Sequence, residues 1–329
     1  MEKIKRGDWV DISQKLPAFC RRIEDQIEQI VEFNCQNNVC KDENAADKNP
    51  DRAWCDSTEL LAMFNKQASF KHKDLFVQRL KEMEQEKIGY NILCVGYALE
   101  CYDMCFNKPV AEALPLKGDA LSKWLEKQYA RESEWAAWGA GSDIDALGSA
   151  FYQNKKYFMV EPDLKTLFDW LNSSVNPNFG MWGNGRNMLD MVNGFYRLTR
   201  GTYAQFNVDL PLPEKVIDTV LTHTKILSEE QHVTACNTLD IIHPLWLCKK
   251  QTDYRFKEGK VFALKWIEEV LDNWTDTKGY SFLLHDHTKV SMMGTEMWLS
   301  ILYLLCDYVG LSHLLTFSPK GVHRLNTQI

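Results

Sequence analysis

Four aspartates interrupt long apolar segments of the chain, and their carboxyl groups are the first candidates for chemistry. Asp56 lies in WCDSTELL, Asp143 in GSDIDALGSAF, Asp190 in NMLDMVNGFY and Asp240 in TLDIIHPLW. A carboxyl group in an apolar setting can act as a general acid or base, because burial moves its pKa toward neutrality. We therefore expect the catalytic groups of an enzyme to lie among these four residues.

The first two acids also fit the beginnings of helices. Asp56 has Glu59 three residues later, which is the spacing of a capping box, and Asp143 has the pattern of an N-cap. Asp145 follows two residues after Asp143 and would point to another side. Two acids near one pocket can also divide the roles of acid and base. The capping and the catalytic interpretations both stay open.

Polar residues surround Asp190 on its predicted helix. Arg186, Asn193 and Arg197 are close enough in sequence to pair with a buried carboxylate, and such pairing would make Asp190 structural. The alternative is that Asp190 is catalytic, with Arg186 and Asn193 binding substrate hydroxyl groups.

Histidines accompany acids at two other places. Asp240 and His243 are one helical turn apart, so His243 could orient a base, hold a metal or be a satisfied core residue, and Pro244 should break or kink the helix. His285 and His287 alternate in LLHDHT, which would direct both toward one metal or substrate, unless this loop is simply solvated.

The last apolar helix adds one more acid. Glu296 follows Ser291 and Thr295, either of which could cap the helix and leave Glu296 for the pocket or for the helix dipole.

Aromatic residues flank the candidate acids: Trp54, Trp138, Trp182, Tyr196 and Trp298. Aromatic rings beside carboxylates suit sugars, whose C–H faces stack on rings while acids bind hydroxyl groups. They also suit a carbocation through cation–π stabilisation, or plain core packing.

Composition and missing motifs exclude several classes of protein. The 329 residues carry a net charge of −7, with a pI near 5.7, which argues against binding nucleic acid or an anionic membrane. No GxGxxG, P-loop, HExxH or GxSxG motif occurs. We therefore expect no cofactor and assign no metal ligand. The N-terminus lacks the apolar core of a secretory signal, and no apolar run is long enough to span a membrane.

The ten cysteines predict the redox state. They show no CxxC spacing, and several lie in apolar runs, as buried free thiols do in a cytoplasmic protein. We expect no disulfide and, in particular, free thiols at Cys94, Cys101, Cys236, Cys248 and Cys306.

Two kinds of helix alternate along the chain. Amphipathic helices with one polar face are predicted at 16–33, 73–87, 162–171, 213–227 and 258–273. Helices that are apolar nearly all round are predicted at 54–64, 89–102, 141–152, 187–199, 234–248 and 293–310. The starts of the apolar helices are 34 to 58 residues apart, which is room for one outer and one inner helix each time.

This alternation predicts an all-α fold of six helical hairpins closed into an (α/α)6 toroid, as a single domain over 1–329. The alternative is an open solenoid or an irregular helical domain. The polar stretch 36–52 should be a mobile loop. Residues 279–284 and 322–329 are the candidate strands.

A Gly-aromatic turn precedes two of the apolar helices, GMWG at 180–183 and KGYSF at 278–282. This pattern is similar to the repeats of the alpha/alpha toroids, which include the six-hairpin glycosidases and the terpenoid cyclase and protein prenyltransferase barrels. The resemblance covers about residues 12–315 and implies the toroid fold and a central pocket. The acid motif of protonating cyclases, Asp-x-Asp-Asp, is here Asp143-Ile144-Asp145-Ala146, and no DDxxD motif occurs. Cys236, Asp240 and His243 do not have the spacing of prenyltransferase zinc ligands.

The function expected from these residues is that of a glycan-active enzyme, most simply a glycoside hydrolase with paired carboxylates in a central funnel. Its catalytic acids are sought among Asp56, Asp143, Asp190 and Asp240. The residues expected to bind a small-molecule or oligosaccharide substrate are Trp54, Asp145, Trp182, Arg186, Asn193, Tyr196, His243, His285 and Glu296. A terpenoid-type cyclase or isomerase that uses the DID run, and a non-catalytic binding toroid, are the alternatives.

Overall fold

The computed structural model describes residues 6–46, 49–83, 88–227 and 233–325. In this part the chain forms thirteen α-helices, a few short helical turns and one two-stranded sheet. The predicted all-α class is therefore confirmed.

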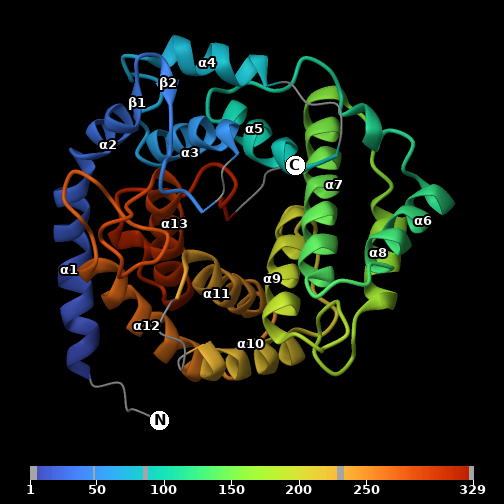
Figure 1. Cartoon of the computed structure of the whole chain (residues 1–329). Helices are drawn as coiled ribbons and strands as arrows, with labels where there is room; N and C mark the ends of the chain where they lie inside the picture. The colour runs from blue at the N-terminus through green and yellow to red at the C-terminus, as the bar shows by residue number, and fades with distance from the viewer. Residues whose placement is uncertain (1–5, 47–48, 84–87, 228–232, 326–329) are drawn as a thin grey trace.

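Six buried helices surround a common centre (Figure 1). They are α3 (Pro50–Met63), α5 (Tyr90–Glu100), α7 (Ala136–Phe158), α9 (Met188–Thr199), α11 (Ala235–Lys249) and α13 (Met292–Val309). Each contacts the next one along the chain, and α13 contacts α3, so the contacts form a closed cycle. Each corresponds to one of the predicted apolar segments, because a helix without a polar face must be covered on all sides.

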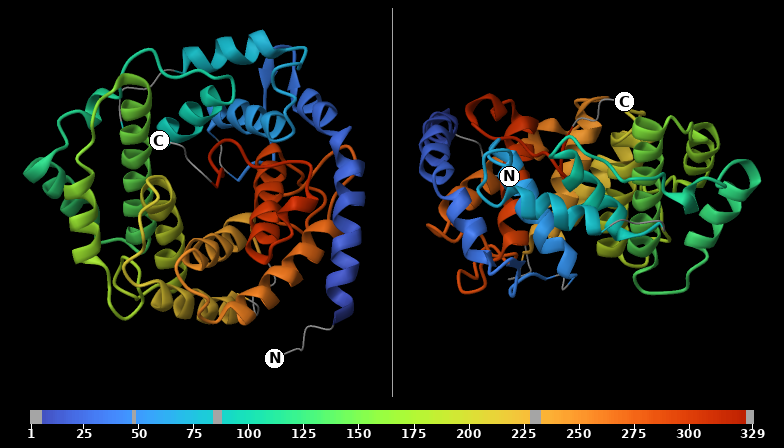
Figure 2. Two further views of the ribbon diagram at one scale, coloured as in Figure 1. Left: turned by 180° about the vertical axis from the view of Figure 1, so that it is seen from behind. Right: turned by 90° about the horizontal axis from the view of Figure 1, so that it is seen from above.

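The remaining helices lie outside this cycle (Figures 1 and 2). They are α1 (Arg6–Glu24), α2 (Ile27–Asn34), α4 (Lys73–Glu82), α6 (Gly118–Tyr129), α8 (Leu164–Ser174), α10 (Pro213–Leu227) and α12 (Phe256–Asp272). The helix predicted over 16–33 is interrupted between α1 and α2. No helix was predicted at α6, whose buried side includes only Leu121, Leu125 and Gln128 and gives a weak periodic pattern.

Helix α3 begins earlier than predicted, and this changes the position of Asp56. The Asn49 side chain is the N-cap and accepts a hydrogen bond from the Asp51 N–H at 3.0 Å, and Pro50 occupies the first turn. Pro is favoured there because its missing N–H is not needed. The capping interpretation of Asp56 is therefore wrong, since the residue lies in the middle of α3.

Asp143 and Pro244 both lie inside helices, so the N-cap predicted at Asp143 and the helix break predicted at Pro244 are wrong. Helix α7 begins at Ala136, so Asp143 lies about two turns inside it and caps nothing at its N-terminus. Pro244 lies inside α11 without ending it. A proline removes only one backbone hydrogen bond, the one that would reach the Asp240 carbonyl, and burial of the surrounding helix compensates for this loss.

The stretch predicted as a mobile loop contains a small hairpin. Strands β1 (Cys35–Gln36) and β2 (Val39–Cys40) pair antiparallel, and a disulfide joins Cys35 to Cys40. The expectation of no disulfide is therefore wrong, whereas the five cysteines singled out as free thiols are free. Residues 47–48 of this stretch lie outside the described residues.

The two predicted strands do not form regular strands where they are described. Residues 279–284 make isolated bridges only, such as Ser281 with Val290. Residues 322–325 are irregular, and 326–329 lie outside the described part of the chain.

Glycines let α7 closely approach α9 and the π-helical turn Arg200–Ala204 that follows it. A Cβ atom added to Gly141 would lie 2.3 Å from the Gly194 carbonyl oxygen, and one added to Gly148 would lie 2.0 Å from the Gly201 carbonyl oxygen. Side chains at these positions would clash with backbone, so the two helices pack backbone to backbone.

Candidate functional site

Residues 318–325 lie inside the ring of inner helices, close to α3 and α13 (Figures 1 and 2). We call residues 318–325 the C-terminal segment. The Ser318 N–H donates to the Met63 carbonyl at 3.2 Å, and the Val322 N–H donates to Glu59 Oε2 at 2.9 Å. His323 bonds to Glu296, and Arg324 forms an ion pair with Glu100. The segment thus joins α3, α5 and α13.

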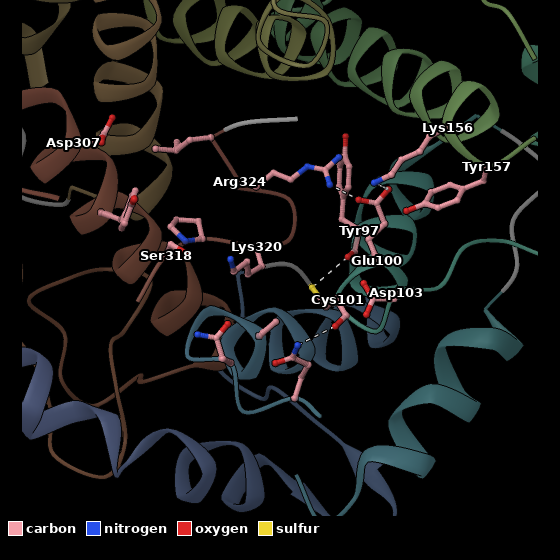
Figure 3. Close-up of a pocket in the computed structure, with 16 residues that line it drawn as sticks. Tyr97, Glu100, Cys101, Asp103, Lys156, Tyr157, Asp307, Ser318, Lys320 and Arg324 are labelled. Atoms are coloured by element: carbon pink, nitrogen blue, oxygen red, sulfur yellow. Dashed lines mark hydrogen bonds and ion pairs between the residues drawn. The ribbon is translucent and has the colours of Figure 1, made fainter. Parts of the chain in front are cut away.

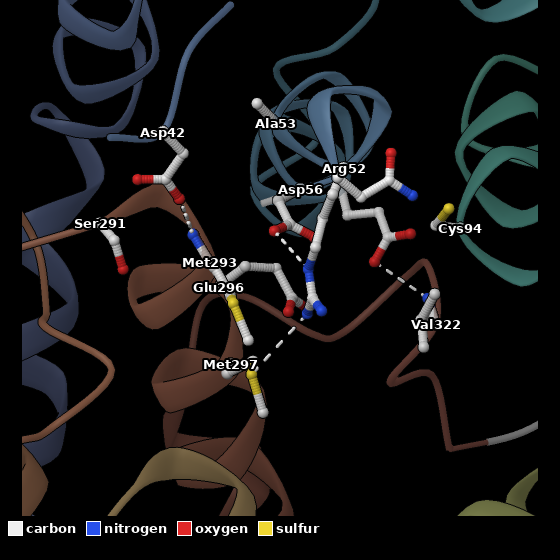
Figure 4. A network of polar contacts seen from close by, with 12 residues as sticks. Asp42, Arg52, Ala53, Asp56, Cys94, Ser291, Met293, Glu296, Met297 and Val322 are labelled. Carbon is white, nitrogen blue, oxygen red and sulfur yellow. Dashed lines mark hydrogen bonds and ion pairs between the residues drawn. The ribbon is translucent and has the colours of Figure 1, made fainter. Parts of the chain in front are cut away.

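Asp56 lies on the inner side of α3, where it pairs with Arg52. The Arg52 Nε donates to Asp56 Oδ2 at 3.1 Å, and its Nη2 lies 3.9 Å from Met297 Sδ (Figure 4). Both side chains line a pocket of 220 Å³ beside the β1–β2 hairpin. Burial raises the pKa of Asp56 to about 7, against the lowering effect of Arg52 and with a further contribution from Glu296.

A second group of ionisable residues includes Glu59, which lies one helical turn after Asp56 on α3. Glu59, Glu296 and His323 each place one side-chain atom so that the three atoms lie within 4.8 Å of one another. His323 Nδ1 lies 2.8 Å from Glu296 Oε2, and Ser300 Oγ donates to Glu296 Oε1 at 2.8 Å. Burial and the charges of Glu296 and Asp56 raise the pKa of Glu59 well above its ordinary value. Burial also disfavours ionised Glu296, but His323 and Ser300 bring its pKa below the ordinary value.

Asp240 lies on α11 beside the polar face of α9. With the Asn193 amide oriented so that its nitrogen faces this acid, the nitrogen donates to Asp240 Oδ2 at 2.6 Å. Burial raises the pKa of Asp240 well above its ordinary value, although Arg197 and Arg200 lower it. Arg197 also lies over the Trp138 ring, 4.9 Å from its centroid.

His243 is buried one turn after Asp240 and packs edge-on against the Tyr196 ring, with centroids 5.0 Å apart. Its Nδ1 has no hydrogen-bond partner. Burial, together with the charges of Arg200 and Lys250, lowers the pKa of His243 to about 3, so the imidazole is neutral at physiological pH.

The two acids of the DID run go to different places. Asp145 is buried and forms an ion pair with Arg200, which follows α9 in a short π-helical turn. Asp143 is half exposed and pairs with Arg131 at the periphery. The run therefore does not present two acids to one pocket.

Asp190 is a helix cap that acts across two helices. Its carboxylate accepts hydrogen bonds from the backbone N–H groups of Ala137 and Trp138, at 3.0 and 2.8 Å, in the first turn of α7. Neither Arg186 nor Arg197, the partners proposed from the sequence, bonds to it. Asp190 and the exposed Arg186 also line a peripheral pocket of 940 Å³ that includes Arg131.

The tryptophans near the acids pack between the two layers of helices. Trp54 contacts Phe76 of α4, with centroids 5.0 Å apart, and the Trp182 Nε1–H donates to the Leu171 carbonyl of α8 at 3.0 Å. Trp298 stacks on Trp266 of α12 at 5.9 Å. These rings are directed away from the ring centre.

The two histidines of the HDH run have separate partners on the surface. His285 Nδ1 lies 3.3 Å from Asn273 Oδ1, and His287 Nδ1 lies 3.2 Å from Thr275 Oγ1. Both are exposed contacts, so the run does not form a joint metal site in this structure.

The structure thus brings some of the sequence-predicted site residues together at the ring centre: Asp56, Asp145, Asn193, Tyr196, Asp240, His243 and Glu296. Glu296 affects the pKa of Asp56, and Glu296 and Asp240 both affect the pKa of Tyr196, which connects four of the six inner helices. Asp143, Asp190, Trp54, Trp182, Arg186 and His285 lie elsewhere.

Sequence reasoning did not assign to the site five basic residues and two acids that lie at the centre: Arg52, Glu59, Glu100, Arg197, Arg200, His323 and Arg324. The helical spacing could have found Arg52 and Glu59, which lie four residues before and three residues after Asp56 on one face of α3. Nothing local to the C-terminal segment indicates that His323 and Arg324 return to the ring centre.

Another pocket lies on the side of the ring where the C-terminal segment enters (Figure 3). It has a volume of 740 Å³, and its polar lining includes Tyr97, Glu100, Lys156, Tyr157 and Arg324. Glu100 is paired with both Arg324 and Lys156, so the pocket wall is charge-balanced.

Comparisons with protein families, with curated protein sequences and with solved structures each found no match for this chain. Among the described residues, none of the helices combines the length and the hydrophobicity that crossing a membrane requires.

Proposed function

We propose that the chain is an (α/α)6 toroid whose ring centre holds a glycan-active site, where Asp56 and Asp240 act as the paired carboxylates of a glycoside hydrolase. The observation that carries this proposal is that both acids are buried on inner helices and act near one group, since Asp240 and Arg52, the partner of Asp56, both affect the pKa of Cys236. Asn193 bonds to Asp240, and Arg197 is close enough to lower its pKa. Amide and guanidinium donors of this kind suit the many hydroxyl groups of a sugar.

The two acids would divide the two roles of hydrolysis between them. Burial raises the pKa of Asp240 well above its ordinary value, so it can hold a proton and would donate it to the glycosidic oxygen as the bond to the sugar carbon breaks. Asp56, with a pKa of about 7 beside Arg52, would accept a proton from the water whose oxygen forms the new bond to that carbon. The proton gained by the leaving group and the proton lost by water balance.

The cyclase alternative receives no support from the DID run, because Asp145 is held by Arg200 and Asp143 lies at the periphery.

The test is a hydrolysis screen of the full chain against aryl glycosides and oligosaccharides, with release of reducing ends as the readout. Asp56→Asn and Asp240→Asn should each lower kcat/KM by about 100-fold or more. Asp143→Asn is the matched control, since it removes a peripheral acid, and it should stay within about twofold of the wild type.

Two results would overturn the proposal. Sugars that bind, by thermal shift, without turnover would indicate a binding toroid. Turnover that survives both substitutions would place the catalytic groups elsewhere.

A further inference from the structure

Two carboxylates and an imidazole meet at the ring centre from three parts of the chain that are far apart in sequence. Glu59 comes from α3, Glu296 from α13 and His323 from the C-terminal segment, and their nearest ligand-type atoms lie within 4.8 Å of one another. Atoms that share one divalent first-row metal ion each lie about 2.0–2.2 Å from it, so they are separated by no more than about twice that distance. A small movement of these side chains would give a metal-binding geometry.

An unsatisfied oxygen inside this group points to a missing ligand. Glu59 is only 1% exposed, and its Oε2 accepts the Val322 N–H, but its Oε1 has no hydrogen-bond partner. A buried carboxylate oxygen without a partner is unfavourable, and a cation would satisfy it.

The charges around the group favour a cation as well. Three neighbouring guanidinium groups already have carboxylate partners, since Arg52 pairs with Asp56, Arg200 with Asp145 and Arg324 with Glu100. Glu296 is bonded to the imidazole of His323, and Glu59 accepts the Val322 N–H. Two carboxylates and a neutral imidazole would balance a charge of +2.

We propose that Glu59, Glu296 and His323 bind a divalent first-row transition-metal ion, and that this ion fastens the C-terminal segment to α3 and α13. Two carboxylate oxygens and one imidazole nitrogen suit Mn²⁺, because this ion prefers oxygen ligands to thiolates. This site is separate from the proposed catalytic pair, Asp56 and Asp240, and the proposal does not depend on hydrolysis.

The experiment uses Mn²⁺ alone as the probe, because the free thiols of the chain would bind Zn²⁺ elsewhere. The metal-free full chain is titrated with Mn²⁺, and the electron paramagnetic resonance signal of the free ion is recorded. The wild type should bind one ion per chain with micromolar affinity or better, and bound Mn²⁺ should raise Tm. His323→Ala and Glu296→Gln should weaken binding at least tenfold.

Two further variants make the result decisive. Glu59→Gln keeps an acceptor for the Val322 N–H but loses the charge, so it should fold, as judged by circular dichroism, and still lose the ion. His313→Ala removes an exposed histidine just before the C-terminal segment and should bind like the wild type. The proposal fails if the wild type leaves the Mn²⁺ signal unchanged, if Glu59→Gln and His323→Ala bind normally, or if His313→Ala weakens binding equally.

Discussion

At the scale of single residues, the buried acids of the ring centre differ in how their charge is compensated. Asp145 has the guanidinium of Arg200, and Glu100 has both Arg324 and Lys156. Asp56 has Arg52 on the same helix, but it also feels the charge of Glu296. Burial dominates the balance at Asp56, and its carboxyl group therefore titrates near neutral pH instead of near pH 4.

This titration predicts a fall in stability as the pH rises. Burial raises the pKa of Asp56 from 3.8 to about 7, so between these values the folded chain keeps a proton that the unfolded chain has released. A raised pKa of an acid makes the free energy of unfolding decrease with pH in this window and level off above it. At about 1.4 kcal/mol per pH unit the decrease comes to about 4 kcal/mol.

Urea unfolding at pH 4.5, 6 and 7.5 measures this effect against Asp56→Asn, which cannot titrate. As the pH rises, the wild type should lose unfolding free energy relative to Asp56→Asn. A difference that stays constant over this range would contradict the raised pKa.

Asp190 supports a second prediction, because it caps α7 instead of lining the ring centre. Asp190→Ala removes the acceptor of the Ala137 and Trp138 N–H groups and should lower the unfolding free energy by about 1–2 kcal/mol. Asp143→Ala removes a half-exposed ion pair and should cost less than about 1 kcal/mol. Equal unfolding midpoints for Asp190→Ala and the wild type would contradict the capping role.

At the scale of helices, the closest packing in the ring depends on glycine. Gly148→Ala should destabilise the protein by about 2–3 kcal/mol, because the new methyl group would meet the Gly201 carbonyl oxygen at 2.0 Å. Gly139→Ala is the matched control on the same helix, since its methyl group would meet only the flexible end of Arg131. That change should be neutral or stabilising by up to about 1 kcal/mol, because alanine favours helix. Thermal unfolding compares the two variants, and equal effects would mean that α7 and α9 can separate at little cost.

Helices were predictable from sequence to the extent that their burial leaves a periodic pattern. Helix α10 has the bounds predicted for it, 213–227, because Pro213 marks its start and its apolar residues recur on one face. The start of α3 was misplaced because the signal of Asn49 and Pro50 lies in a polar stretch, while the apolar pattern begins only at Trp54. Helix α6 was missed because few of its residues are buried.

The candidate site was less predictable than the helices. An acid within an apolar helix is easy to recognise in a sequence. Three acids recognised in this way, Asp56, Asp240 and Glu296, lie at the ring centre. Whether an acid faces the centre or caps a neighbouring helix depends on rotation and register between helices, and Asp190 shows that an N-terminal position alone does not decide it. Contacts made by the C-terminal segment connect residues more than two hundred positions apart, and no local pattern encodes them.

At the scale of the whole molecule, the C-terminal segment holds three inner helices together. It donates to Glu59 of α3, bonds to Glu296 of α13 and pairs with Glu100 of α5. The first and last inner helices are neighbours only because the ring closes, and the C-terminal segment spans this junction.

A chain that ends at residue 317 should therefore lose stability and open at one side of the ring. Glu59, Glu296 and Glu100 would lose the Val322 N–H, His323 and Arg324 respectively, and a buried acid that loses its partner costs about 3–5 kcal/mol. The unfolding free energy should fall by at least about 3 kcal/mol. Hydrogen exchange should accelerate in α3, α5 and α13 but not in α6 and α8, which the segment does not bond to. A chain that ends at residue 325 keeps the contacts and is the control, and the same exchange pattern in both truncated chains would mean that the segment takes no part in closing the ring.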